Sequence, residues 1–300
     1  MDNTIMVFSG RAFSPKDIEL IKWVRNTYPK LSIQELAATV CELLEWTTPA
    51  GRPKVGQCRA FLNKLESEDI IKLPTKRNHV QDMTPSKARI EFDTREIVGE
   101  VRTFEPLELK IAYSGDNLRR WRSYVDQYHM LGDKREYGSR LMYFIQSGDK
   151  ELGCLQFSAS AWALEDRDKW IGWNIEDKKA RLHLIINNSR YLIFPWVRIK
   201  NLASKALSLA ARQIQEDWLR EYCYAPVLLE TFVDQEHFKG TCYKAANWIH
   251  LGQTKGRGRA DSHHTNSLSQ KDIYVYPLQK DFRACLKGAK PCKAVNPDEC

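Results

Sequence analysis

The spacing of the apolar residues differs between two parts of this 300-residue sequence. Between Ser14 and Leu65, apolar residues recur at helical spacing in three short runs. Between Leu107 and Tyr276, short runs typical of β-strands alternate with helical runs. Because strands and helices of this kind bury their apolar faces in packed layers, the pattern predicts an α+β chain. We expect a small helical N-terminal domain followed by a larger, mixed α/β domain.

The composition is that of a globular protein, with 43% hydrophobic and 11% aromatic residues. The uncharged apolar runs, such as residues 191–197, are far shorter than the roughly 20 residues that a bilayer span needs. The first residues lack the basic start and apolar core of a secretory signal. We therefore expect a cytoplasmic protein with no membrane partner.

Eight cysteines are scattered singly, without the CxxC pairs of zinc sites and thioredoxin-like redox centres. We interpret them as reduced thiols. Cys285, Cys292 and Cys300 could hold a metal with help from His263 or His264, but their spacings are wide, and we assign no metal site.

The predicted N-terminal domain covers residues 1–74 and contains three helices. Ser14 is an N-cap that precedes a proline at the first helical position. Ser32 and Glu35 form a capping box, in which each side chain bonds the backbone of the other, at the start of a second helix. A turn over residues 47–51 then leads into the third helix.

The third helix has an apolar side and a polar side. Its amide and guanidinium groups are of the kinds that read base edges when a helix enters a major groove. The candidate nucleic-acid residues are Arg52, Lys54, Gln57, Arg59, Asn63 and Lys64. Residues 70–74 would form a wing strand behind this helix. The pattern predicts a (winged-)helix-turn-helix-like DNA-binding domain; a protein-docking module and a purely structural bundle are the alternatives.

Three further segments follow: a linker at residues 75–104, the α/β domain at residues 105–279, and a basic tail rich in Cys, Lys and Pro at residues 280–300. Strands are expected at residues 107–113, 141–146, 152–158, 191–194, 227–233 and 272–276. Helices are expected at residues 116–131, 176–186, 202–218 and 237–249, with turns at residues 147–149 and 187–189.

The loop after residues 191–194 is a candidate phosphate site. It opens a long helix, and the unpaired backbone N–H groups and the dipole of a helix N-terminus favour an anion at one place. The candidate cofactor-binding residues are Arg198, Asn201, Leu202, Ala203 and Ser204.

Two short motifs accompany this order of elements: Arg198-x-x-Asn201-x-Ala203, and Cys242-Tyr243-x-x-x-Asn247-Trp248. Both resemble signatures of the general N-acetyltransferase (GNAT) superfamily, in which glycines stand where this chain has asparagines. The resemblance implies a GNAT-like fold, acyl-coenzyme A as a candidate cofactor, and Tyr243 as a general acid. Glu230 is a candidate general base. Structural roles are the alternative for both residues.

The most specific segment is Phe232-Val-Asp-x-x-x-Phe-x-Gly-Thr-Cys-Tyr-x-Ala-Ala-Asn-Trp-x-x-x-Gly-x-Thr-x-Gly-Arg-Gly-Arg259. Together with residues 190–204 and the head of the chain, it resembles the DruA component of Druantia anti-phage defence systems. The resemblance covers most of residues 14–278. It implies a defence protein whose partners include a helicase-like protein; the domain also occurs in front of some transposases.

A basic region lies near the end of the chain. From Lys239 to Lys293, eleven Lys or Arg stand against three Asp. Within it, the candidate nucleic-acid residues are Lys255, Arg257, Arg259, His263 and His264, because guanidinium groups on a glycine-rich loop suit phosphates. A merely solvated loop is the alternative, and Asp261 with the two histidines could instead serve catalysis or bind a metal.

Three functions follow from these features. The first is a DNA-binding defence protein whose acyltransferase-like domain has no turnover. The second is an acyl-coenzyme A-dependent N-acyltransferase that modifies nucleic acid or a protein amine. The third is a transposition-associated DNA-binding protein. We favour the first.

Overall fold

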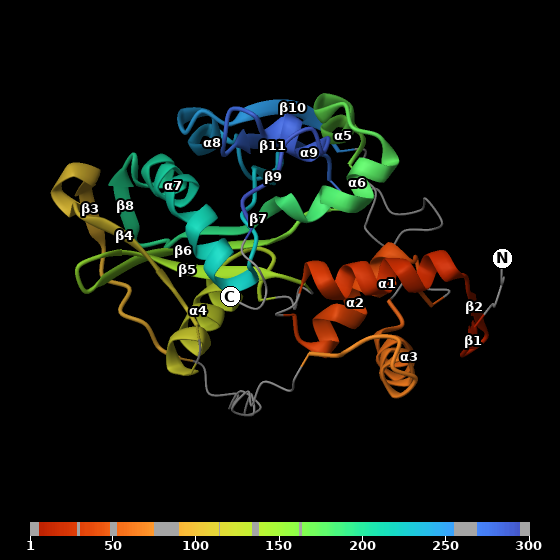
Figure 1. Ribbon diagram of the computed structural model, residues 1–300. Coiled ribbons are helices and arrows are strands. Elements are labelled where there is room, and N and C mark those ends of the chain that lie inside the picture. The colour runs from red at the N-terminus through yellow and green to blue at the C-terminus, as the bar shows by residue number, and fades with distance from the viewer. Residues whose placement is uncertain are drawn as a thin grey trace.

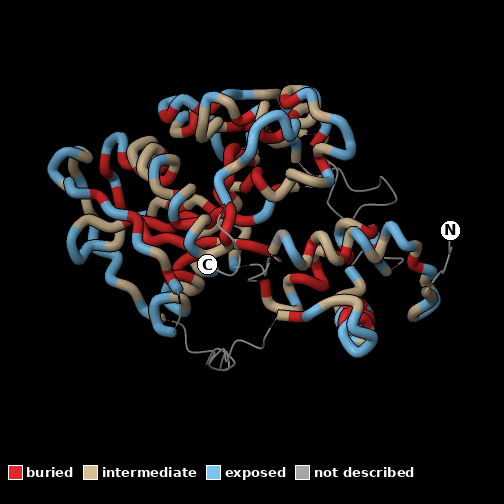
Figure 2. Tube along the Cα trace, in the orientation of Figure 1, coloured by how far each residue is buried: buried red, intermediate tan, exposed pale blue. Residues whose placement is uncertain are grey.

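The computed structural model describes residues 6–28, 31–48, 53–74, 90–113, 115–133, 138–161, 164–254 and 269–294. It contains a small helical head, residues 6–74, beside a larger sheet domain (Figure 1). Each part has its own buried core (Figure 2). None of the described helices is both long enough and apolar enough to cross a membrane.

The head begins with a hairpin of β1 (Met6–Phe8) and β2 (Arg11–Phe13). Its three helices are α1 (Pro15–Thr27), α2 (Ile33–Leu43) and α3 (Val55–Ser67). The predicted N-cap at Ser14 and the predicted capping box at Ser32 are both present: the Ser14 hydroxyl accepts from the backbone of Asp17, and that of Ser32 accepts from the backbone of Glu35. These local bonds explain why the helices begin where the sequence predicts.

The core of the head is aromatic. Phe13 stacks on Phe61 at a ring distance of 4.0 Å, and Trp46 meets both rings edge-on. Residues 70–74 form no strand, so the predicted wing is wrong. The connection from Leu43 to Val55 also exceeds the three- or four-residue turn of a helix-turn-helix.

The second domain is built on a seven-stranded sheet with the order β10-β11-β9-β7-β6-β5-β4. Neighbouring strands are antiparallel except for β7 and β9, which are parallel. The strands are β4 (Leu107–Ile111), β5 (Arg140–Ser147), β6 (Lys150–Ala159), β7 (Ile185–Ile193), β9 (Leu228–Asp234), β10 (Ile249–Gln253) and β11 (Lys271–Pro277). The parallel pair is joined for only three residues of each strand, so β7 and β9 separate beyond Asn187 and Glu230.

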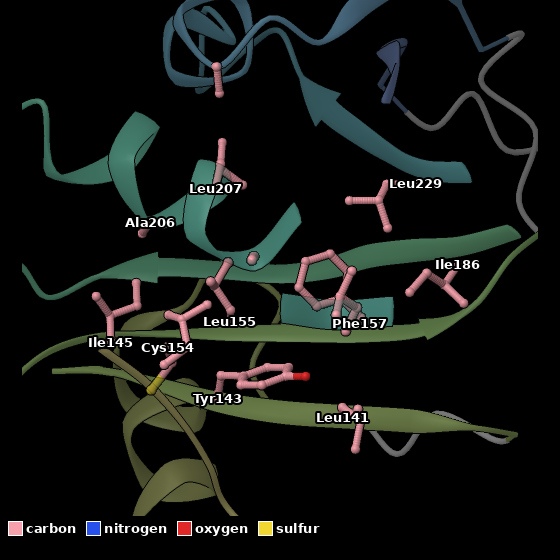
Figure 3. Close-up of a cluster of buried hydrophobic side chains, with 14 of the residues drawn as sticks. Leu141, Tyr143, Ile145, Cys154, Leu155, Phe157, Ile186, Ala206, Leu207 and Leu229 are labelled. Carbon is pink, nitrogen blue, oxygen red and sulfur yellow. The ribbon is translucent and has the colours of Figure 1, made fainter. Parts of the chain in front are cut away.

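Helices cover both faces of this sheet. The Tyr143 hydroxyl reaches Asp217 of α7 (Leu202–Tyr222), whereas the ring of the next residue, Phe144, meets Tyr124 of α4 (Gly115–Tyr128). Because successive side chains of a strand point to opposite faces, α4 and α7 lie on opposite sides. Figure 3 shows the α7 side, where Ala206 and Leu207 pack over the apolar side chains of β5 and β6.

Part of the predicted linker is a strand. β3 (Ile97–Glu100) pairs in parallel with β8 (Val197–Lys200), and η1 (Val101–Phe104) follows it. Phe92 also stacks on Tyr124 at 3.7 Å. The linker prediction is therefore wrong for residues 97–104, since a few apolar side chains suffice to anchor an edge of the domain.

Other boundaries also differ from the predictions. The helix expected at residues 176–186 is replaced by α5 (Glu165–Ile171), α6 (Ile175–Arg181) and η2 (Leu182–Leu184). The turn expected at residues 187–189 lies inside β7, and the helix expected at 237–249 is only α8 (Thr241–Ala245). The tail contains α9 (Phe282–Leu286), whose apolar residues are buried.

The cysteines follow the prediction only in part. Six described cysteines are free thiols. Cys223 forms a disulfide, so the expectation of reduced thiols is wrong at that position.

Candidate functional site

The start of α7 is the first candidate site. Asn201 precedes the helix with φ 65° and ψ 4°, the left-handed conformation that glycine and asparagine tolerate best. No acidic residue lies in the first turn. Leu202 is buried, while Ala203 and Ser204 are half-buried, so the backbone of the first turn lies near the surface. This arrangement suits an anion.

Two cations near this helix start have carboxylate partners. Arg198 lies 3.0 Å from Glu96, and Lys205 lies 2.6 Å from Glu105. The pairing with Lys205 lowers the pKa of Glu105, whose carboxylate is exposed. The loop therefore offers backbone N–H groups to an anion, with Arg198 and Lys205 shared with carboxylates.

Tyr243 lies between the separating strands β7 and β9. It is 6% exposed, and its hydroxyl donates to the Asn188 side chain at 2.8 Å. The Thr231 hydroxyl of β9 donates to the Asn188 carbonyl of β7 at 3.0 Å. Burial raises the pKa of Tyr243 well above its usual value of 10. The gap between the strands is thus filled by hydrogen-bonded side chains of the protein itself.

The exposed side of α3 is the second candidate site. Gln57, Arg59 and Asn63 are exposed, and Lys54 and Lys64 are half-buried. The opposite side carries the buried Cys58, Phe61, Leu62 and Leu65. In Figure 1, α3 lies at the lower edge of the head, away from the seven-stranded sheet.

A family model described as "Druantia protein DruA" matches residues 64–268. The chain belongs to the DruA family. No curated protein matches its sequence.

Several solved structures resemble this DruA-family chain over its sheet domain. A spermidine N-acetyltransferase chimera from Vibrio cholerae and hSSAT is 10% identical, with 57% of this chain and 95% of that chain covered and a TM-score of 0.38. The aminoglycoside acetyltransferase AAC(6')-Ib in complex with coenzyme A is 12% identical, with 57% and 94% covered and a TM-score of 0.37. A GNAT-family acetyltransferase from Bacillus cereus is 12% identical, with 57% and 96% covered and a TM-score of 0.35. The C-terminal region has a mixed α+β fold built on the seven-stranded sheet.

Acyl-coenzyme A fits this DruA-family chain only at its phosphate end. The left-handed Asn201 keeps the backbone turn, and Asn247, the second asparagine at a family glycine, is also left-handed with φ 61°. The Tyr191 hydroxyl, however, donates to the Ala203 carbonyl at 2.6 Å, which places the tyrosine ring beside the first turn of α7. Tyr243 is buried as well, and we derive no catalytic step through a thioester.

The strained backbone at Asn201 supports a test. Asn201→Val is expected to lower the free energy of unfolding by about 1–2 kcal/mol, because a β-branched residue is penalised in the left-handed region. Asn201→Gly should be neutral or slightly stabilising. Urea denaturation compares these variants with Lys200→Val, an exposed strand neighbour that should change stability by less than about 0.5 kcal/mol. Equal stability of the valine and glycine variants would contradict the left-handed assignment.

Glu230 lies at the end of the part of β9 that pairs with β7, and it is fully buried. Its Oε2 pairs with Arg167 at 2.8 Å, and its Oε1 accepts from the Ala161 backbone at 3.0 Å. Arg167 also pairs with Asp168, whose other oxygen meets Lys178 at 2.7 Å. Both carboxylate oxygens of Glu230 are occupied, as expected of a structural ion pair rather than a free general base.

The remaining predicted residues, Arg52, Lys255, Arg257, Arg259, His263 and His264, lie outside the described residues, as does Asp261.

The sequence interpretation missed a histidine–aspartate pair on the two outer strands. His250 Nε2 lies 2.9 Å from Asp272 Oδ1, and Gln235 donates to the same oxygen at 2.6 Å. The separation of 22 residues gives no local signal; only the pairing of β10 with β11 joins them. This DruA-family chain thus carries a half-exposed imidazole that is oriented by a carboxylate.

Among the described residues, one group has the composition of a metal site: Asp234, Glu236 and His237. The Asp234 carboxylate already accepts from the Ser269 hydroxyl and from the Glu236 backbone. We assign no metal to this acidic surface cluster.

Proposed function

We propose that this chain is a nucleic-acid-binding component of an anti-phage defence system, whose GNAT-like domain acts as a scaffold without acyl transfer. The match to the Druantia protein DruA supports the defence role. The observation that carries nucleic-acid binding is the exposed polar side of α3.

Three properties of α3 favour a DNA contact. Gln57 and Asn63 expose amides, and Arg59 exposes a guanidinium, the groups that pair with adenine and guanine edges. Ala60 between them is exposed and small, so the helix can approach a groove closely. The helix start carries no acidic residue and no side-chain cap, which leaves its N–H groups for phosphate.

The overall charge supports the same partner. A formal net charge of +8 favours a polyanion at long range. Binding through several phosphates would make the affinity fall steeply with salt.

Arg59→Ala is expected to weaken binding to duplex DNA roughly tenfold, because one arginine contact is worth about 1–3 kcal/mol. Fluorescence anisotropy over a salt series measures the change. If Arg59 contacts a phosphate, the slope of log affinity against log salt falls by about one unit.

Arg212→Ala is the matched control, because Arg212 is exposed on α7 and its loss changes the net charge equally. The control should retain the affinity of the parent chain. Equal weakening by both substitutions, or binding that does not depend on salt, would contradict an α3 interface.

Acyl transfer is the alternative function, and the left-handed turn at Asn201 favours it because the turn suits a phosphate. The buried Tyr243 predicts that calorimetry with acetyl-coenzyme A detects no binding up to millimolar concentration. Binding that Asn201→Asp abolishes would instead place the cofactor at α7 and overturn the scaffold proposal, since the added carboxylate repels phosphate.

A further inference from the structure

A cavity of about 560 Å³ lies where the head meets the sheet domain. Segments far apart in the chain line it: α1 of the head, the α6–η2 segment, the residues after α7, and the C-terminal segment after α9. Figure 1 shows the head below α6, and the Trp23 ring of α1 meets the His183 ring of η2 at this junction. The volume lies within the range of about 300–1,000 Å³ typical of small-molecule sites.

The lining of this cavity is cationic. It includes Arg181, Lys290 and Lys293, and none of the described residues that line it is acidic. Arg181 and Lys290 each have a carboxylate partner, Asp177 at 2.9 Å and Asp281 at 3.2 Å. No described carboxylate pairs with Lys293, which leaves that ammonium for an anionic ligand.

The backbone holds these cations in place. The Ala225 N–H donates to the Lys293 carbonyl at 2.9 Å, and Tyr224 pairs with Ala294 in a β-bridge. On the other wall, a side chain at Gly288 would collide with the Arg181 guanidinium. The C-terminal segment is therefore fixed against the cavity.

The lining also contains aromatic rings and an unsatisfied polar atom. Trp23 and Tyr224 pack edge-on against His183, at ring distances of 5.9 and 4.9 Å. His183 Nδ1 is buried and has no hydrogen-bond partner among the described residues. The aromatic rings give the cavity an apolar wall beside its cationic one.

We propose that this cavity binds a nucleotide, with the phosphate at Lys293 and Lys290 and the base among Trp23, Tyr224 and His183. An aromatic base matches the ring-lined wall. The phosphate matches the cationic wall. The nucleotide is either free or the exposed end of a nucleic-acid strand. The site is separate from α3, so it does not depend on the DNA interface proposed above.

Calorimetry on the full chain tests the proposal with four probes: ADP, pyrophosphate, adenosine and a short single-stranded oligonucleotide. Each is titrated into the parent chain, Lys293→Glu and Lys287→Glu. Lys287 is also exposed in the C-terminal segment but does not line the cavity, so it is the matched control. Circular dichroism and thermal melting establish that the variants remain folded.

We expect ADP to bind more tightly than pyrophosphate or adenosine, and Lys293→Glu to weaken ADP at least tenfold while Lys287→Glu leaves it unchanged. Binding of the oligonucleotide alone, with the same dependence on Lys293, would support the strand end as the source. The proposal is overturned if neither ADP nor the oligonucleotide binds at millimolar concentration, if Lys293→Glu has no effect, or if pyrophosphate binds as tightly as ADP.

Discussion

The Arg167→Met variant is expected to unfold with a free energy about 3–5 kcal/mol lower than that of the parent chain, because it leaves the buried Glu230 carboxylate without its cation. Both side chains of this pair are fully buried, at a distance of 2.8 Å. The substitution also removes the bond from Arg167 to the Ala161 carbonyl at 2.8 Å. Urea denaturation followed by circular dichroism gives the change in unfolding free energy.

Two further variants separate the buried charge from a simple loss of arginine. Lys169→Met breaks a 2.6 Å pair with Glu165 on the exposed side of the same helix, and it should cost less than about 1 kcal/mol. Adding Glu230→Gln to Arg167→Met removes the unpaired charge and should restore about 1–3 kcal/mol. Similar losses in Arg167→Met and Lys169→Met would refute the buried ion pair.

This prediction also bears on catalysis. Each oxygen of the Glu230 carboxylate already accepts a hydrogen bond from a fixed partner, and the side chain is fully buried. If Glu230 were a general base, its substitution would remove an activity without a large cost in stability. If Glu230 instead forms a structural ion pair, breaking that pair has a large cost in stability.

Signals within a few residues gave reliable predictions of where α1 and α2 begin. Ser14 with Asp17, and Ser32 with Glu35, bond within one turn, so the residues themselves determine where α1 and α2 begin. The hairpin of β5 and β6 was predicted for the same reason, since Gly148 in the turn has φ 56°.

Long-range contacts explain the predictions that failed. Asn187, Asn188 and Ser189 have the composition of a turn, yet they lie in β7 because the Asn188 side chain donates to the backbone of Gln156 and Arg190. The register between β6 and β7 shifts here, because Gln156 pairs with Arg190 and Phe157 with Asn188, which leaves Ser189 of β7 as the extra residue. Partners 32 residues apart cannot be identified from local pattern.

Local motifs also predict some features of the candidate sites, whereas long-range contacts determine the others. The left-handed backbone at Asn201 and Asn247 follows from motif spacing, because asparagine replaces glycine where that conformation is needed. The burial of Tyr243 cannot be predicted from motif spacing, since it depends on how far β7 and β9 separate. The junction cavity likewise needs the docking of the head, which no segment of the sequence encodes alone.

His183 at this junction should make stability depend on pH. Burial, and then the charge of Arg181, lower the pKa of His183 from 6.5 to about 3. Between these values the unfolded chain binds a proton at this residue and the folded chain does not, so stability falls as the pH falls below about 6.5. At pH 5 the loss from this residue alone is about 2 kcal/mol relative to pH 8.

His183→Phe isolates this effect, because phenylalanine keeps a ring beside Tyr28, Trp23 and Tyr224 and cannot be protonated. Urea denaturation at pH 8 and pH 5 should show a decrease about 2 kcal/mol smaller in His183→Phe than in the parent chain. The matched control is His237→Phe, at a histidine whose side chain is 53% exposed, and it should keep the decrease of the parent chain. The same decrease in His183→Phe and the parent chain would mean that His183 is open to water in the folded protein, and that the head does not pack against the sheet domain as described.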